Sequence, residues 1–207
     1  MRLNLGCGND IREGWVNVDH PGAVSLLPNP GNHELIGCDL DAPSLRLPLD
    51  NNTVTEILAQ QVLEHIRNLL PLLQELHRVT VPGGELKVSV PYGGADGAWA
   101  DPTHVRAFFI DSWIYFRQPT YCFSNYGYKG DWEPQGIGIV MNQKEYGDPV
   151  DMGKVRRDLM FQRNKASEMR CVLEAIKPIR LPVPGHKFDK PECPVRILFR
   201  DDTEDTK

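Results

Sequence analysis

The sequence lacks the features that mark membrane proteins and disulfide-rich secreted proteins. No stretch approaches the roughly 18 consecutive apolar residues that a membrane-spanning helix needs. Residues 1–6 have a strand-like pattern without the apolar segment of a signal peptide. The five cysteines are far apart and form no C-x-x-C pair: Cys7, Cys38, Cys122, Cys171 and Cys193. We therefore expect reduced thiols, no disulfide framework, no cysteine-based zinc site and a cytoplasmic location.

The sequence also lacks an excess of positive charge. It has 23 Lys and Arg against 28 Asp and Glu, a net charge of −5, so it has no overall basic field for non-specific nucleic-acid binding. Hydrophobic residues make up 41% and charged residues 25%, which are ordinary values for a globular protein. Proline is in surplus, at 17 of 207 residues. We expect one folded domain, a monomer or homodimer, with neither a membrane nor a nucleic acid as partner.

The first half of the chain alternates between strand and helix patterns. Short apolar stretches predict strands over residues 2–5, 15–18, 34–38, 54–59 and 85–90. Leu69, Leu73, Leu76 and Val79 form a helical stripe that predicts a helix over 67–79, which the Pro-Gly-Gly at 82–84 then ends. Strands separated by crossovers predict a mostly parallel sheet with layers on its faces.

The second half is richer in aromatic residues, with eleven between Tyr92 and Tyr128. These rings can wall a binding pocket or fill the core of an insertion, and the sequence leaves both readings open. Asp111 predicts the cap of a short helix that runs to Phe116. Strands are predicted over 136–141 and 195–199, and a helix over 165–177.

Three successive strand ends carry groups that suit a nucleotide-like ligand. Gly6 and Gly8 follow the first strand, Asp19 follows the second, and Asp39-Leu40 follows the third. Glycines let a ligand approach backbone amides, and a carboxylate can accept both hydroxyls of a ribose or an adenine amine. The sequence does not match the dinucleotide-binding fingerprint G-x-G-x-x-G, because Ile11 occupies the position of the third glycine.

The order and spacing of these motifs resemble compact class I S-adenosylmethionine-dependent methyltransferases of the type-11-like family over roughly residues 2–91. The resemblance is carried by segments 3–8, 14–19, 38–40 with 47–52, 62–66 and 78–84, the last departing from the family pattern at Thr80 and Val81. Beyond residue 91 it is limited to 101–106 and the last strand.

The resemblance implies an α/β fold: a Rossmann-like, doubly wound, mostly parallel seven-stranded sheet with an aromatic-rich cap in the C-terminal half. Residues 1–200 would form a single domain, with 1–91 as the cofactor-binding half, 92–194 as the acceptor-side elaboration, and 201–207 as a charged tail.

The resemblance also implies S-adenosyl-L-methionine as cofactor and S-adenosyl-L-homocysteine as product. Asp19 would hold the ribose diol, and Asp39 and Leu40 would contact the adenine. The remaining cofactor-binding positions would lie near the methionine part and the sulfonium: Leu5, Gly6, Cys7, Gly8, Gln60 and Gln61. We expect Cys7 only to fill the space between the glycines, since nothing nearby in sequence would lower its pKa.

On the acceptor side, methyl transfer from a sulfonium is an in-line displacement that needs few special side chains. We expect no metal ion. His104 and His65 are the candidate bases, and the guanidinium of Arg106 is expected to bind a carboxylate or phosphate of the acceptor. Tyr92 and Trp99 are the candidate pocket walls. Alternatively, residues 104–106 form a hydrogen-bonded anchor and His65 orients its loop. The other histidines, His20, His33, His77 and His186, are expected at the surface.

These features favour methyl transfer to an oxygen or nitrogen of a small-molecule or glycan acceptor. Segment 60–63 lacks the Pro-Pro-Tyr loop of DNA amino-methyltransferases. The sequence has no Pro-Cys pair, which cytosine C5 methyltransferases use. It also has no evident Asp/Asn triad of the kind found in metal-dependent, catechol-type methyltransferases. Two alternatives remain open: a cofactor-binding scaffold without catalysis, and a nucleic-acid-modifying methyltransferase.

Overall fold

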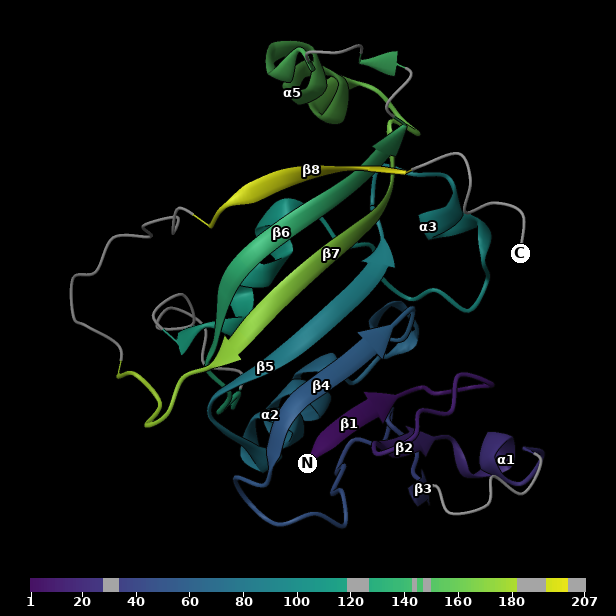
Figure 1. The fold of residues 1–207 in the computed structure, drawn as a ribbon, viewed down its shortest axis with the longest axis vertical. Coiled ribbons are helices and arrows are strands. Elements are labelled where there is room, and N and C mark those ends of the chain that lie inside the picture. The colour runs from purple at the N-terminus through teal and green to yellow at the C-terminus, as the bar shows by residue number, and fades with distance from the viewer. Residues whose placement is uncertain (28–33, 119–126, 143–144, 147–149, 182–192, 201–207) are drawn as a thin grey trace.

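A computed structural model describes residues 1–27, 34–118, 127–142, 145–146, 150–181 and 193–200 (Figure 1). Its eight strands are β1 (Arg2–Leu5), β2 (Val16–Asp19), β3 (Glu34–Gly37), β4 (Val54–Gln60), β5 (Thr80–Pro91), β6 (Trp132–Asn142), β7 (Ala166–Ala175) and β8 (Val195–Arg200). The helices are α1 (Pro21–Val24), α2 (Leu69–Val79), α3 (Gly97–Ala100) and α5 (Met152–Phe161). Two 3₁₀ segments, Leu63–His65 and Ile110–Phe116, complete the described elements. The predicted tail 201–207 lies outside the described residues.

All eight strands form one sheet in the order β3-β2-β1-β4-β5-β7-β6-β8. The pairs from β3 through β5 are parallel, β7 runs antiparallel to both β5 and β6, and β8 pairs parallel with β6. The predicted mostly parallel α/β sheet is therefore confirmed. The predicted number of seven strands differs from the eight observed, because a segment predicted to be helical is a strand.

That segment is 165–177, where the predicted helix is wrong. In β7, alternate residues Met169, Cys171, Leu173 and Ala175 are at most 2% exposed, which is the two-residue period of a strand. The same stretch carries apolar residues at helical spacing, so its local pattern is ambiguous. The neighbouring strands make this segment a strand, because β5 and β6 both offer backbone hydrogen-bond partners along nearly the whole of β7.

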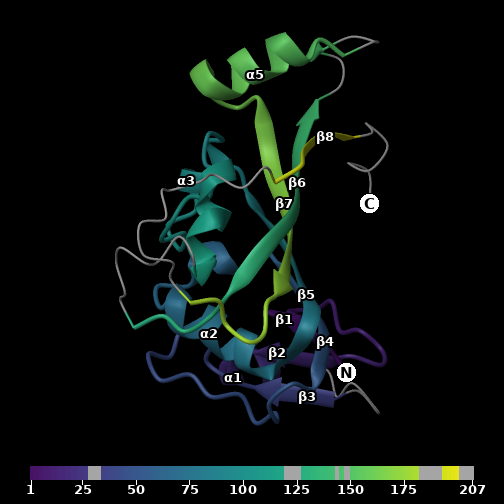
Figure 2. The same cartoon turned by 90° about the vertical axis from the view of Figure 1, so that its left-hand side faces the viewer.

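Helix α2 confirms the predicted helix, starting two residues later than expected. Its buried side chains Leu69, Leu72, Leu73, Leu76 and Val79 form the apolar stripe that faces the core. Figure 2 shows α2 and α3 on the same side of the sheet. The connection 6–15 between β1 and β2 contains no helix, so this first crossover is short.

Most of the described aromatic residues of the second half fill the core. Phe108 and Trp113 stack with ring centroids 5.1 Å apart, and Phe116 packs against Trp113. Tyr92 and Tyr128 are also buried. Trp99, Phe109 and Tyr115 are exposed, whereas Tyr121, Phe123 and Tyr126 lie outside the described residues. The predicted short helix is a 3₁₀ segment, with Phe109 rather than Asp111 at the cap position.

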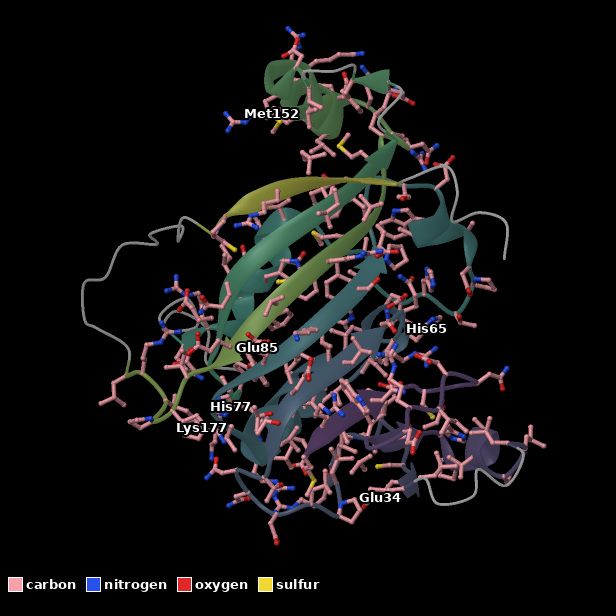
Figure 3. All side chains as sticks on the ribbon, viewed as in Figure 1. Glu34, His65, His77, Glu85, Met152 and Lys177 are labelled. Carbon is pink, nitrogen blue, oxygen red and sulfur yellow. The ribbon has the colours of Figure 1, made fainter. Side chains whose placement is uncertain are left out.

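His77 is buried, so its expected place at the surface is wrong. Its ring is 4% exposed, packs edge-on against Trp132 at 5.6 Å, and bonds through Nε2 to the carbonyl of Ile176 at 3.1 Å. Helix α2 turns this residue inward at the end of the sheet opposite His65 (Figure 3). His20 is exposed as expected, and His33 and His186 lie outside the described residues. Among the described helices, none is long and apolar enough to cross a membrane.

Candidate functional site

A cleft of about 370 Å³ lies where β1, β2, β3 and β4 end and their following loops meet. Its walls combine carboxylates with apolar and backbone surface: Gly6, Asp19, His20, Asp39, Leu40, Asp41, Gln61, Val62, His65 and Ile66. Figure 3 shows His65 just beyond the end of β4. In open α/β sheets, ligands bind at this carboxyl edge of the parallel strands.

The first wall of the cleft is the glycine loop after β1. Gly6 and Gly8 adopt φ values of +56° and +47°, which L side chains rarely adopt. A Cβ added at Gly6 would also lie 2.5 Å from Cγ2 of Val62, whereas a Cβ at Gly8 would meet nothing within 4 Å. Residue 6 must therefore be glycine both for its backbone angle and for its contact with the loop after β4.

The carboxylate wall is built by Asp19 and Asp39. Asp19 Oδ2 accepts from the Gly8 amide at 2.7 Å, and its Oδ1 accepts from the His20 amide at 2.7 Å. Asp39 Oδ1 accepts from the Asp41 amide at 2.9 Å. These bonds fix both carboxylates at the cleft while leaving further lone pairs for a ligand.

The cleft suits a ligand with a vicinal diol, an amine, a planar ring and a positive charge. Asp19 and Asp39 offer acceptors to hydroxyl and amino groups, and Leu40, Val62 and Ile66 offer apolar surface to a ring. Asp41 adds a third carboxylate, so the cleft favours a cationic group over an anionic one.

The two glutamines at the end of β4 line different clefts. Gln61, at φ +54°, lines the cleft and donates from Nε2 to Ser89 Oγ at 3.1 Å. Gln60 lines a different cleft, and its Oε1 accepts from Arg12 at 3.1 Å. Of the pair, the structure brings only Gln61 to the cleft with Asp19 and Asp39.

Leu5 and Cys7 support the glycine loop from beneath. Leu5 is 1% exposed in the core. The Cys7 amide donates to the Val18 carbonyl at 3.2 Å, and its thiol is buried. Burial, with a contribution from Asp19, raises the pKa of Cys7 to about 11, so the thiol is protonated near neutral pH.

Beside the cleft, the structure brings His65 and His104 together from segments 39 residues apart. Their rings meet edge-on with centroids 4.8 Å apart. His104 Nδ1 lies 3.1 Å from the Ala98 carbonyl oxygen, which can only accept, so Nδ1 carries the proton.

His65 is held through a relay of two side chains. Thr103 Oγ1 donates its proton to Asp101 Oδ1 at 2.6 Å and lies 2.9 Å from His65 Nδ1, so it accepts from that nitrogen. The bonds from Thr103 lower the pKa of Asp101 and keep it ionised. In each ring the tautomer with the proton on Nδ1 leaves the lone pair on Nε2.

Glu64 is a candidate site residue that the sequence patterns did not single out. It is 1% exposed, and neither carboxylate oxygen has a hydrogen-bond partner among the described residues. Burial raises the pKa of Glu64 to about 6. One ligand atom each from Glu64, His65 and His104 lie within 4.8 Å of one another. The only sequence signal was its position next to His65.

The other acceptor-side candidates do not line this cleft. Arg106 donates from Nε to the Ile66 carbonyl at 3.1 Å and from Nη2 to the Arg67 carbonyl at 2.8 Å. Tyr92 is buried against Phe109. Trp99 is 62% exposed and donates from Nε1 to the Gly93 carbonyl at 3.0 Å. Arg106 thus ties two loops together.

A second, larger cleft of about 600 Å³ lies across strands β4 to β8. It is lined by apolar residues, glycines and the basic side chains Lys87, Arg170 and Arg196, with no carboxylate or histidine among its lining residues. It therefore lacks the carboxylates that can hold a ribose diol or an amine, and the smaller cleft is the better candidate for the chemistry.

Comparison with known proteins agrees with this fold. Residues 22–88 match the model of a protein family described as a methyltransferase domain. A SAM-dependent methyltransferase from Archaeoglobus fulgidus superposes with a TM-score of 0.54 at 14% identity, over 84% of this chain and 85% of that one. A SAM-dependent methyltransferase from Thermotoga maritima gives 0.53 at 12% identity, over 85% and 81%. No curated protein matches the sequence.

Proposed function

We propose that the chain is a class I S-adenosylmethionine-dependent methyltransferase that methylates an oxygen or nitrogen atom of a small-molecule or glycan acceptor. When bound, S-adenosylmethionine supplies an electrophilic methyl group on a sulfonium. The proposal rests above all on one observation: the carboxylate-lined cleft at the strand ends lies directly beside the Glu64–His65–His104 cluster. His65 belongs to both.

In this proposal residues 1–91 hold the cofactor. Asp19 accepts from the ribose diol, Asp39 accepts from the adenine amine, and Leu40 packs on the ring. The backbone of Gly6 and Gly8 approaches the methionine part, with Leu5 and Cys7 shaping the loop beneath. Gln61 borders the sulfonium, and Gln60 stabilises the end of β4 through Arg12.

Residues 92–194 then serve the acceptor. In the metal-free form of the reaction, the Nε2 lone pair of His104 takes the acceptor proton, and His65 orients the acceptor from the cleft wall. Trp99 is exposed on α3, next in sequence to the Ala98 carbonyl that holds His104, and this exposure supports a role for Trp99 in contacting the acceptor. Arg106 and Tyr92 position these loops. We place the reaction in the cytoplasm, as a monomer or homodimer.

A radiolabelled methyl-transfer assay tests the proposal. The protein is incubated with methyl-labelled S-adenosylmethionine and a panel of phenols, amines, carboxylic acids and glycans, and S-adenosylhomocysteine release is measured. His104→Ala should lower turnover at least about 100-fold, the lower end of the range for a lost acid–base group. Its affinity for S-adenosylhomocysteine should stay within about threefold of wild type. Unchanged turnover in His104→Ala would remove His104 from the mechanism.

The same assay addresses the non-catalytic alternative. A cofactor-binding scaffold would bind S-adenosylhomocysteine normally and transfer no label to any acceptor class. A nucleic-acid-modifying enzyme would transfer label to oligonucleotides and bind them more weakly as salt rises.

A further inference from the structure

We propose that Glu64, His65 and His104 form a binding site for a divalent transition-metal cation beside the cofactor cleft. A carboxylate oxygen and one nitrogen of each imidazole lie within 4.8 Å of one another. The two histidines come from different segments, at the 3₁₀ segment Leu63–His65 and in the loop after α3, so the fold and not the local sequence assembles the set.

The unpaired state of Glu64 is the first reason for the proposal. A carboxylate that is 1% exposed normally has hydrogen-bond donors or a cation beside it, because an unpaired buried charge is strongly unfavourable. No other described residue donates to either of its oxygens, and the backbone donor that lowers its pKa is its own amide. A bound cation in contact with Glu64 would supply the missing partner.

The hydrogen bonds behind the imidazoles are the second reason. Metal-binding histidines usually donate their other ring N–H to a carbonyl or a carboxylate, which fixes the ring and the tautomer. His104 does so to the Ala98 carbonyl, and His65 does so to Thr103, which in turn donates to Asp101. The nitrogen that remains in each ring is therefore Nε2, and that of His104 lies 3.8 Å from Asp101 Oδ2.

The chemistry of the three ligands selects the class of ion. Two imidazoles with one carboxylate are typical of Zn²⁺ and of Fe²⁺, Mn²⁺ or Co²⁺ sites with open coordination positions. Ca²⁺ prefers six to eight oxygen ligands, and Mg²⁺ prefers carboxylates with several waters, so both fit this set poorly. Ligands at 2.0–2.2 Å from such an ion stand roughly 3–3.5 Å apart, so the side chains must close by about 1–2 Å.

The inference does not depend on the proposed function, but it would alter how that function works. With an ion bound, the two Nε2 atoms are ligands and no longer free to act as bases. Because His65 also lines the cofactor cleft, the open positions of the ion would adjoin the acceptor side. The metal-free reaction expected from the sequence would then be replaced by a metal-assisted one.

Calorimetric titration of Zn²⁺ into the chelator-stripped full-length protein tests the site. We expect saturable binding of one ion per chain. Glu64→Gln and His104→Ala should each weaken it at least about 100-fold, and Thr103→Ala about 10-fold, since Thr103 acts only through His65. Glu85→Gln removes an exposed carboxylate elsewhere on the sheet and should bind as wild type does. A Co²⁺ absorption spectrum provides a second signature of nitrogen ligation.

Thermal unfolding shows whether a variant that loses Zn²⁺ binding is still folded. Glu64→Gln removes an unpaired buried charge, so its Tm without metal should equal or exceed that of wild type. Zn²⁺ at about 100 times its Kd should raise the wild-type Tm by roughly 5–10 °C and leave that of Glu64→Gln unchanged. Wild-type affinity in Glu64→Gln and His104→Ala, or no saturable binding at all, would overturn the inference.

S-adenosylhomocysteine binding, measured on the same samples, separates the two proposals. Cofactor binding without Zn²⁺ binding would reject the metal site and leave the proposed function standing. Zn²⁺ binding without cofactor binding would do the reverse.

Discussion

The replacement Gly6→Ala tests the geometry of the cofactor cleft through stability alone. Residue 6 has φ +56°, and a new Cβ would lie 2.5 Å from Cγ2 of Val62, closer than real Cβ contacts come. Gly8→Ala is a matched control, because residue 8 has a similar φ of +47° but open space where its Cβ would lie.

The expected magnitudes follow from these two differences. A non-glycine residue in the left-handed region costs about 1–2 kcal/mol, and overpacking adds about 1–3 kcal/mol. Gly6→Ala should therefore lower the free energy of unfolding by about 2–5 kcal/mol, and Gly8→Ala by about 1–2 kcal/mol. For a chain of this size that is a Tm decrease of roughly 2–4 °C per kcal/mol.

A double-mutant cycle, measured by urea unfolding, compares the wild type with Gly6→Ala, Val62→Ala and the double variant Gly6→Ala/Val62→Ala. Removing the Val62 methyl groups relieves the overlap, so the double variant should be more stable than the sum of the single changes by about 1–3 kcal/mol. Equal destabilisation by Gly6→Ala and Gly8→Ala, with additive behaviour in the cycle, would refute the close contact between the glycine loop and Val62.

Three further predictions concern individual groups. Asp19→Ala should weaken S-adenosylhomocysteine binding about 100-fold in calorimetry, since two charge-assisted bonds of about 1.5 kcal/mol each are lost. The exposed Asp50→Ala should change it less than twofold. Burial lowers the pKa of His77 below 6.5, so the unfolded state takes up its proton first and stability falls as pH drops below about 6.5. Urea unfolding at pH 7.5 and 5.5 should show a smaller decrease in His77→Gln. With a pKa of about 11, Cys7 should be alkylated by iodoacetamide at pH 8 at least about 100-fold more slowly than a free cysteine, as followed by peptide mass spectrometry.

The cofactor half of the fold was predictable because its signals are local. Glycines and aspartates directly follow short apolar strands, and the ends of parallel strands meet at one edge whatever the details of packing. The leucine stripe of α2 likewise needs no knowledge of its partners. These features place Asp19, Asp39 and the glycine loop around one cleft.

The features that the sequence did not predict are those whose structure depends on residues distant in sequence. Strand β7 has apolar residues that suit either a helix or a strand, and only the free edges of β5 and β6 select the strand. Gln60 and Gln61 are neighbours in sequence, but successive residues of a strand point to opposite faces of the sheet. Only Gln61 therefore reaches the cleft with Asp19 and Asp39. Glu64 lies beside His65 in sequence, but its burial depends on the loop around His104, whose neighbour Val105 donates to the Glu64 carbonyl at 2.8 Å.

Isothermal titration of S-adenosylhomocysteine into the purified protein tests the central claim most directly. The account predicts one molecule bound per chain at the strand-end cleft, with a micromolar Kd and a matching rise in Tm. A titration with no heat, together with an unchanged Tm at saturating ligand, would contradict it.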